Sequence, residues 1–591
     1  MGRHRSSGGW IVAVVGLVLA AACGPVATAG ADPVREVPVS INASLPDDQG
    51  KPVVLDGGVD IPPADQCPCP GVIINHGFLG SWTDSGSVAR ELAAHGYVVL
   101  RYSSRGFGKT PGEVDLMGPK ERQDLLDAVH WLNDPGNPVV GGQLVPDDIG
   151  QFGGSYGGAH AWSLAMSGDP AVRTVVPTAT WTDIYDALMP NDVELLAYVN
   201  GFYATGLDTV AAAQNSQLST TDNYSQEMHR WIAEANAGLN TADLKAGMDS
   251  RSVTGRYGDI HIPVFIVQGT NDGLFTQNQA LAAYQALAAR NVPVRLYVGG
   301  IGHPPSDSSL DHPEAQHVSA EILAWFDHYL KGVANGIDQM PPIEYSRASY
   351  FHNHWDGTTR SASTYPFGTP TRLHLCTTGP TGGTLSADPC PSAPPAVAVN
   401  GYAGQGTEQE PVTSDYADQF HQGLQNATQG QDVDLSGLST APPTLTYDGP
   451  QLADGGDLDL AGIPTFHLQA ASVDQVPAGL KGGAAAFQLD PKLYDVGPDG
   501  RASLVTRGAF AEGLDAVPTG SSTQPQHAVD FDAFGLSYKI PAGHHLRITL
   551  STEDPPYLRP TVNPFAVTLF AGSSVDLPSA AGLGPTPAGL G

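Results

Sequence analysis

Three short stretches of the chain hold residues that could together perform nucleophilic catalysis. Residues 153–157 read Gly-Gly-Ser-Tyr-Gly and match the pattern G-x-S-x-G around Ser155. This pattern is typical of a sharp turn from a strand into a helix, in which small residues let the backbone pass and leave the serine exposed. Asp272 and His303 each lie in a glycine-containing loop directly after an apolar run. Placed in this way, an aspartate and a histidine could activate the serine hydroxyl as a nucleophile.

The order of the three residues along the chain is that of the catalytic triad in α/β-hydrolases. In such a triad, His303 would take the proton of Ser155 during attack on a carbonyl carbon and later deliver it to the leaving group. Asp272 would orient the imidazole and stabilise its charged form. Each feature alone has an ordinary explanation, because the chain contains 70 glycines and turns often contain Asp. All three, in order at the ends of successive predicted strands, predict a serine hydrolase.

The tetrahedral intermediate of such an enzyme needs hydrogen-bond donors for its oxyanion. The backbone N–H of Tyr156, the residue after the nucleophile, is one predicted donor. The second should come from the loop after the apolar run at 71–75, most simply the backbone N–H of Phe78 in His76-Gly77-Phe78. An ordinary turn is the alternative interpretation of this tripeptide.

The strands and helices that must position these residues alternate, which predicts βαβ units and a parallel sheet. Strand patterns occur at 35–43, 52–61, 71–75, 97–102, 148–152, 173–177, 263–268 and 294–298. Helical spacing is found at 87–95, 120–133, 156–167, 278–290 and 313–331. The predicted fold class is therefore α/β, with a hydrolase domain over residues 32–335.

Three further regions depart from this alternation. Residues 184–259 show short helical patches between two strands of the sheet, which predicts a helical cap over the strands' carboxyl ends, where α/β sheets bind ligands. Residues 340–578 show short β runs separated by glycine- and proline-rich turns, which predicts a β-sandwich or jelly-roll domain. Residues 579–591 are rich in glycine, proline and alanine, and we expect a flexible tail there.

Residues 1–31 have the pattern of a signal peptide. Basic residues at 3–5 precede an apolar run over 10–22, and small residues at 27–31 fit a cleavage site. The run is too short to span a bilayer comfortably, and no later stretch is long enough. We therefore expect an exported protein, secreted or held at the cell surface. Because Cys23 follows Leu-Ala-Ala-Ala, which resembles a lipobox, a lipid anchor at Cys23 is an alternative.

Four cysteines beyond Cys23 suggest disulfides in an exported chain. Cys376 and Cys390 lie in one loop-rich stretch, and we predict that they pair. Cys67 and Cys69 are separated by one residue, which is a strained spacing for a bridge and differs from the usual C-x-x-C of a redox or metal site. We interpret these two cysteines as structural, or as an unusual local bridge.

The formal net charge of −32 disfavours nucleic acids and anionic membranes as partners, because both carry negative charge themselves. The predicted chemistry needs no cofactor and no metal ion. His312, His317 and His328 resemble a cluster, but the last two are eleven residues apart on a predicted helix, so a surface face is the better interpretation. The stretch Asp495–Gly500 is predicted to be a turn, because it lacks the ligand spacing of a calcium loop.

Several of these motifs together resemble the family of X-prolyl dipeptidyl-peptidases and cocaine-esterase-like acyl hydrolases. In the catalytic part, the similar stretches are residues 153–158, the Asp272 turn, Gly302-His303 and residues 325–332. In the C-terminal part, residues 493–501, 504–508 and 540–544 are similar to the jelly-roll signature of the family. The resemblance covers nearly the whole chain after residue 31. It implies a catalytic domain, a helical cap and a jelly-roll domain that together frame the active site.

One departure from the family concerns the oxyanion site. Cocaine-esterase-type members use a tyrosine hydroxyl after the third strand, whereas Phe78 stands here and offers only its backbone N–H. The cap also shows no identifiable acidic residues to hold a free amino terminus. We therefore expect an exported acyl hydrolase acting on a small-molecule ester or a short peptide, with an Xaa-Pro dipeptidyl-peptidase as the alternative. An alternative of another class is a non-catalytic surface-binding protein on a hydrolase scaffold, which the complete triad disfavours.

Overall fold

The computed structural model describes most of the chain from residue 34 onward. The residues described are 34–203, 224–270, 272–303, 313–346, 358–390, 397–401, 444–474, 485–513, 523–552, 554, 557–559 and 565–587. The predictions for residues 1–31, including Cys23, and for His312 lie outside these residues.

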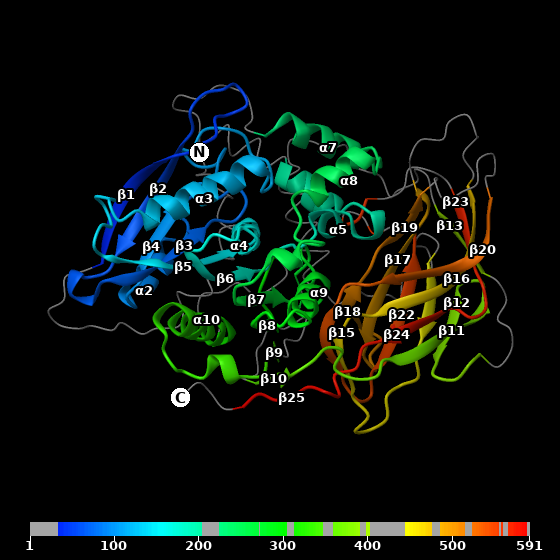
Figure 1. Ribbon diagram of the computed structural model, residues 1–591. Coiled ribbons are helices and arrows are strands. Elements are labelled where there is room, and N and C mark those ends of the chain that lie inside the picture. Colours follow the sequence, from blue (N-terminus) through cyan, green and yellow to red (C-terminus); the bar gives the residue numbers. More distant parts are fainter. Residues whose placement is uncertain are drawn as a thin grey trace, which may run out of the picture.

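Within the described residues, an eleven-stranded sheet forms the centre of the N-terminal domain (Figure 1). Its strand order is β1-β2-β4-β3-β5-β6-β7-β8-β9-β10-β25. The strands from β4 to β9 pair in parallel, whereas β1, β2, β10 and β25 pair antiparallel at the two edges. The strands are β1 Arg35–Asn42, β2 Val54–Ile61, β3 Cys69–Asn75, β4 Val98–Tyr102, β5 Leu144–Gly154, β6 Val172–Thr178, β7 Val264–Gly269, β8 Val294–Gly299, β9 Ile343–Ser346, β10 Thr359–Ala362 and β25 Gly584–Pro585.

Helices cover both faces of this sheet. One face packs against α2 (Gly86–Ala94) and α10 (Pro313–Lys331). The other packs against α3 (Pro119–Asn133), α4 (Tyr156–Ala165) and α9 (Gln277–Ala288). Strand β3 is buried along its whole length, which explains why its sequence is a continuous apolar run and does not alternate. The predicted α/β class is confirmed.

Helices follow β6 in the region predicted to form a cap. Besides a helical segment that includes residues 196–203, they are α5 (Ile184–Leu188), the 3-10 turn η3 (Pro190–Asp192), α7 (Gln226–Asn236), α8 (Ala242–Asp249) and the 3-10 turn η4 (Tyr257–Asp259). Asp183, Ser225 and Thr241 precede α5, α7 and α8, and each side chain accepts a first-turn backbone N–H at 3.0, 3.2 and 3.0 Å, respectively. These N-caps fix where the helices begin. The three helices lie together beside the C-terminal domain (Figure 1).

The C-terminal domain is all-β, as predicted. Its strands enclose a second core that includes Phe466, Phe487 and Phe531. One twelve-stranded arrangement contains most of the strands, and β15 pairs with β21 separately. The strands are β11 Thr371–Gly379, β12 Gly382–Ser386, β13 Val397–Gly401, β14 Leu445–Asp448, β15 Leu458–Gly462, β16 Thr465–Asp474, β17 Ala485–Val496, β18 Ala502–Arg507, β19 Phe510–Gly513, β20 Thr523–Asp532, β21 Leu536–Ile540, β22 His545–Ser551, β23 Phe565–Leu569 and β24 Ser574–Leu577.

Two predicted boundaries differ from the structure. Strands β9 and β10 belong to the hydrolase sheet, although they lie within the stretch 340–578 assigned to the β domain. The segment predicted as a flexible tail is ordered through residue 587, because Ala580 and Leu583 are buried and β25 pairs with β10. Both corrections have one cause: short strands at a sheet edge gain their partners from distant parts of the chain, which local composition does not reveal.

Smaller sequence predictions have structural counterparts. Disulfides join Cys376 to Cys390, as predicted, and Cys67 to Cys69, which is the local bridge considered above. The stretch Asp495–Gly500 contains a turn in which the Gly500 N–H donates to the Gly497 carbonyl. Among the described helices, none has the length and apolar character needed to cross a bilayer.

Candidate active site

Ser155 occupies a strained turn between β5 and α4. Its backbone has φ 57° and ψ −122°, a conformation that non-glycine residues rarely adopt. The glycines of the motif are required by sterics: a Cβ on Gly153 would lie 2.4 Å from the Gly157 carbonyl oxygen, and one on Gly157 would lie 2.2 Å from the Asn75 carbonyl oxygen. The Ser155 N–H donates to the Thr178 carbonyl at 2.9 Å. The turn therefore holds the serine at the carboxyl end of the sheet.

The structure brings Ser155, His303 and Asp272 together. The serine Oγ lies 2.9 Å from His303 Nε2. The other ring nitrogen, Nδ1, lies 2.9 and 3.1 Å from the two carboxylate oxygens of Asp272. Because a carboxylate can only accept, Nδ1 carries the proton in the neutral ring, and Nε2 is left to accept the serine proton. This is the arrangement that general-base activation of a hydroxyl requires.

The loop after β7 holds Asp272 through backbone donors. Its Oδ1 accepts the N–H groups of Leu274 and Phe275, both at 2.9 Å, and its Oδ2 accepts the His303 N–H at 3.1 Å. A Cβ on Gly302, whose φ is 138°, would lie 2.5 Å from this Oδ2, so a larger residue would displace the carboxylate. All three triad residues are at most 5% exposed. Burial strengthens these charged hydrogen bonds, because little water competes for them.

The two predicted oxyanion donors lie beside the nucleophile. Tyr156 is the first residue of α4, where backbone N–H groups have no partner within the helix. Phe78 follows β3, and its N–H donates to no group among the described residues. Ser155, Tyr156 and Phe78 line one cavity. Both N–H groups are thus placed where they could serve an oxyanion, and this role stays a prediction.

A buried hydrogen-bond network of His76, Ser104 and His160 contacts the backbone next to these donors, and the sequence did not predict it. His76 Nε2 accepts the Ser104 N–H at 2.9 Å, so its Nδ1 carries the proton and donates to the Gly77 carbonyl at 2.7 Å. That carbonyl and the Phe78 N–H belong to the same peptide group. The Gly77 carbonyl also accepts the Gly80 N–H at 3.0 Å. His76 therefore helps to fix the orientation of a predicted oxyanion donor, and its hydrogen bond polarises that donor.

The network continues to the helix that follows the nucleophile. The Ser104 hydroxyl lies 3.0 Å from His160 Nε2, and His160 Nδ1 donates to the Tyr156 carbonyl at 2.8 Å. Burial lowers the pKa of His160 to about 3 and also lowers the pKa of His76. Both rings are neutral at physiological pH, which this pattern of one donor and one acceptor per ring requires.

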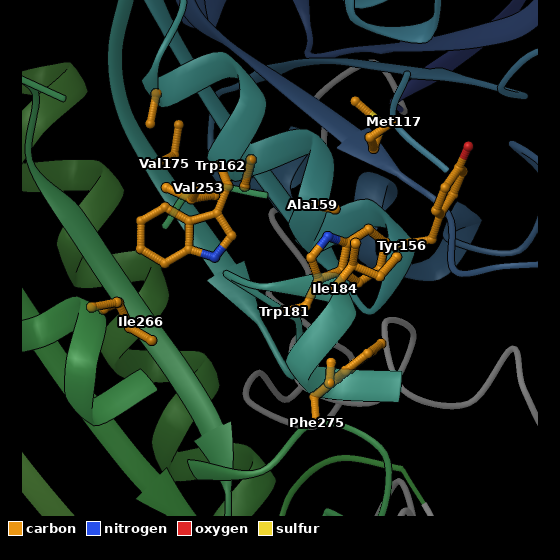
Figure 2. Close-up of a cluster of buried hydrophobic side chains, with 14 of the residues drawn as sticks. Met117, Tyr156, Ala159, Trp162, Val175, Trp181, Ile184, Val253, Ile266 and Phe275 are labelled. Carbon is orange, nitrogen blue, oxygen red and sulfur yellow. The ribbon is translucent and has the colours of Figure 1, made fainter. Parts of the chain in front are cut away.

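The cavity beside Ser155 is almost wholly apolar. Its volume is about 100 Å³. The cap contributes Met228, Trp231 and Met248, and the sheet side contributes Phe78, Trp181 and Phe275. Figure 2 shows Tyr156, Trp181, Ile184 and Phe275 in one cluster of buried side chains. None of the described lining residues carries a carboxylate, ammonium, guanidinium or imidazole group.

The all-β domain contacts the elements that carry the site. The Tyr557 hydroxyl donates to the Gly273 carbonyl, next to Asp272 in the chain. Asn278, at the start of α9, donates to the Ala533 carbonyl at 2.9 Å. The Arg559 N–H donates to the Glu194 carbonyl in the cap region at 2.9 Å. The second domain therefore supports both the triad loop and the cap.

Of the histidines considered together in the sequence, the two described ones, His317 and His328, do not share a site. His317 Nε2 lies 2.8 Å from Glu344 Oε1, while His328 Nδ1 lies 3.0 Å from the Val333 carbonyl. His317, Glu321 and Glu344 are close enough together to suggest a metal site, but the Arg295 guanidinium donates to both carboxylates. The guanidinium already pairs with both carboxylates, which favours an ion-pair network over a metal site.

Comparisons with known proteins agree with this geometry. Residues 54–304 match the X-Pro dipeptidyl-peptidase (S15) family, and residues 335–573 match the X-Pro dipeptidyl-peptidase C-terminal non-catalytic domain. A putative Xaa-Pro dipeptidyl-peptidase of Bacillus anthracis is 25% identical over 270 residues, and a cocaine esterase of Rhodococcus sp. (strain MB1 Bresler) is 23% identical over 348 residues. These matches span 44% and 52% of this chain, and 43% and 57% of the two relatives, respectively.

A solved structure extends the likeness to both domains. An α-amino acid ester hydrolase superposes with a TM-score of 0.65 at 18% sequence identity, covering 94% of this chain and 98% of that one. This likeness establishes the two-domain fold, namely an α/β-hydrolase domain followed by an all-β domain. By contrast, the match to the Bacillus relative spans less than half of that protein.

Proposed function

Because the chain belongs to the family of X-prolyl dipeptidyl-peptidases and cocaine-esterase-like serine hydrolases, we propose that it hydrolyses carboxylic esters through an acyl-enzyme on Ser155. The observation that carries this proposal is the unbroken chain of hydrogen bonds from Ser155 through His303 to Asp272. The chemistry requires a nucleophile, a base and an orienting carboxylate in this geometry.

The reaction follows from the positions of these groups. His303 Nε2 takes the serine proton while Oγ forms a bond to the ester carbonyl carbon, and the N–H groups of Phe78 and Tyr156 stabilise the oxyanion. Collapse of this intermediate breaks the bond to the alcohol oxygen, which receives the proton from His303. Water then attacks the acyl-enzyme, again losing a proton to His303, and Ser155 regains its proton as the carboxylic acid leaves.

A fluorophosphonate probe tests the nucleophile directly. The wild-type protein should be labelled once, on Ser155, and Ser155→Ala should lose both the label and ester hydrolysis. Ser87→Ala is a matched control, because Ser87 is exposed on α2, across the sheet from the site. A well-folded wild-type protein that remains unlabelled and turns over no ester would refute the proposal and favour a non-catalytic binding protein.

An Xaa-Pro dipeptidyl-peptidase is the second candidate, and the names of the relatives favour it. The two activities need different pockets, because a dipeptidyl-peptidase must hold the charged amino terminus of its substrate. Rates on Xaa-Pro anilides and on short p-nitrophenyl esters separate them. We expect rapid ester turnover without Xaa-Pro cleavage, and the reverse pattern would assign the peptidase activity.

Export is a further part of the proposal. It is supported by the signal-peptide pattern of residues 1–31 and by two disulfides, which form and persist mainly outside the cytosol. Mass spectrometry of the mature N-terminus tests it: cleavage near residue 31 indicates secretion, and a lipid on Cys23 indicates a surface anchor. An intact N-terminus on a protein recovered only from the cytosol would contradict export.

A further inference from the structure

We propose that Tyr557, a residue of the all-β domain, is a positioning residue for the triad, because it holds the peptide group that orients Asp272. This inference rests on the proposed hydrolysis and adds a residue of the second domain to it. The Tyr557 hydroxyl donates to the Gly273 carbonyl. That carbonyl shares a peptide group with the Leu274 N–H, which donates to Asp272 Oδ1 at 2.9 Å. The hydroxyl thus lies two hydrogen bonds from the carboxylate of the triad.

A hydrogen bond to the carbonyl of this peptide group acts on its N–H in two ways. It restricts rotation of the peptide plane, and it draws electron density toward the oxygen, which makes the N–H a stronger donor. Asp272 needs fixed and strong donors, because it stays charged while it stabilises the imidazolium of His303 during catalysis. Its Oδ1 also lies 3.1 Å from His303 Nδ1, so a shift of the peptide would reach the histidine directly.

The loop that follows Asp272 is held from both domains. The Phe275 carbonyl accepts the side-chain amide of Gln268, a residue of β7, at 2.6 Å. The Gly273 carbonyl has its partner in the all-β domain instead, and no described residue of the hydrolase domain donates to it. The hydrolase domain therefore supports one end of this loop, and Tyr557 supports the end next to the carboxylate.

Tyr557 is itself fixed within the all-β domain. Its side chain is buried, and the Arg507 guanidinium carbon lies 4.3 Å from the centroid of its ring. Arg507 donates to Asp554 at 2.7 Å, and Lys492 Nζ lies 2.6 Å from the same carboxylate. Although burial raises it, the two cations hold the pKa of Asp554 below its ordinary value. The ring therefore rests on an ion-paired cation, which gives the hydroxyl a defined position.

The same short segment also contacts the cap. The Tyr557 ring meets the ring of Tyr198 edge to face, with centroids 6.1 Å apart. Two residues further, the Arg559 guanidinium lies 3.5 Å from the buried Glu194 carboxylate. Residues 557–559 thus contact the triad loop and the cap at once. Packing of the second domain is therefore coupled to the place where Asp272 is oriented.

Tyr557→Phe tests the role of the hydroxyl, because it keeps the ring and its contact with Arg507. We expect kcat for p-nitrophenyl acetate to fall roughly tenfold with KM nearly unchanged, since one hydrogen bond behind the triad is lost and no substrate contact is. The rate constant for fluorophosphonate labelling of Ser155 should fall by the same factor.

Tyr538→Phe is the matched control. Tyr538 is a buried tyrosine of the same domain, and its hydroxyl donates to Asp495 Oδ2 at 3.0 Å, away from the triad. Both variants lose one buried hydroxyl and should lose similar thermal stability, but Tyr538→Phe should keep the kcat of the wild type.

A double-mutant cycle shows whether Tyr557 acts through the carboxylate. Once Asp272→Ala has removed that group, Tyr557→Phe should change the residual kcat no further, because nothing is left to position. The proton NMR signal of His303 Nδ1–H gives a second readout. It should broaden in Tyr557→Phe, as the Asp272–His303 hydrogen bond samples more than one geometry, and it should keep its wild-type shape in Tyr538→Phe.

Three results would overturn the inference while leaving the proposed hydrolysis intact. Equal kcat values in Tyr557→Phe and Tyr538→Phe would mean that the hydroxyl only stabilises the fold. A loss of kcat that persists in the Asp272→Ala background would mean that Tyr557 acts by another route, and a rise in KM alone would indicate substrate binding. A folded wild-type protein that is neither labelled nor active would instead refute the proposed function.

Discussion

The two sides of the Ser155 hydroxyl differ in how they are built. On one side, Asp272 and His303 come from loops at neighbouring strand ends, and hydrogen bonds hold both carboxylate oxygens and both ring nitrogens of the pair. On the other side, the cavity is assembled from the cap, the sheet edge and the loops, and its walls are held by apolar packing. In the proposed function, the first region supplies the groups that break the bond, and the second lies against the molecule that carries it.

The difference teaches how each region should respond to change. A directional polar site fails when one atom is moved or removed, because each group acts only through the others. An apolar wall tolerates substitution and shifts its preference gradually, since burial depends on area and not on direction. The predictions below test this contrast, from the largest expected effect to the smallest.

Removing the nucleophile should have the largest effect. Ser155→Ala should lower kcat by roughly 10⁴-fold to 10⁶-fold, with the remaining rate due to oxyanion stabilisation and binding. Affinity for a non-hydrolysable apolar ligand should change little, because the cavity wall is intact. Steady-state kinetics with active-site titration measure kcat, and calorimetry measures the affinity for the ligand. A loss of less than tenfold would mean that another group is the nucleophile.

Changing the orienting carboxylate should have the next largest effect. Asp272→Asn keeps the size of the side chain, but its amide can donate to His303 Nδ1 and so favours the tautomer that cannot accept the serine proton at Nε2. We expect kcat to fall by about 10⁴-fold with a small change in KM. If the variant keeps most of the activity, Asp272 has only a structural role and its assignment to the triad is wrong.

The network behind the oxyanion donors should have an intermediate effect. His76→Ala removes one of the two hydrogen bonds that the Gly77 carbonyl accepts and that hold the Gly77–Phe78 peptide. We expect kcat to fall by up to about 100-fold while KM stays nearly constant. His76→Asn, whose amide N–H can take the place of Nδ1–H, should recover part of the loss. Equal losses in both variants, accompanied by lower thermal stability, would indicate a packing role only.

The smallest effect concerns the pH dependence of stability. Because burial lowers the pKa of His160 to about 3, the unfolded chain binds this proton first as the pH falls below the ordinary histidine value. The contribution of neutral His160 to the free energy of unfolding is therefore fully present above about pH 6.5. It falls by roughly 1.4 kcal/mol per pH unit as the pH is lowered toward 3.

Denaturant titrations from pH 7 to pH 4 measure this slope. His160→Gln should flatten it, and His130→Gln, at an exposed histidine on α3, is the control. If the slope of His160→Gln equals that of the wild type, His160 is not held neutral by the fold.

The sequence was informative where the chemistry depends on neighbouring residues. The turn around Ser155, the loops with Asp272 and His303, and the alternation of strands and helices are all local patterns, and they allowed the fold class to be predicted. The network of His76, Ser104 and His160 could not be predicted, because no spacing rule links residues that meet only across the sheet edge.

The cavity lining and the edge strand β25 could not be predicted from local sequence patterns for the same reason. Phe78, Trp181, Met228 and Phe275 meet only once the cap has folded over the sheet. Each alone fits an ordinary core residue, so composition could not reveal a binding wall. Strand β25 has only two residues and is a strand only because it pairs with β10. Its own sequence therefore indicates a tail.

Trapping the acyl-enzyme tests the central claim most directly. Wild-type protein mixed with p-nitrophenyl octanoate is quenched in acid within milliseconds, digested, and mapped by mass spectrometry. The account predicts one octanoyl group per chain, on Ser155, appearing at the rate of the p-nitrophenol burst. Rapid ester turnover with Ser155 unmodified at every time, or with the octanoyl group on another side chain, would contradict it.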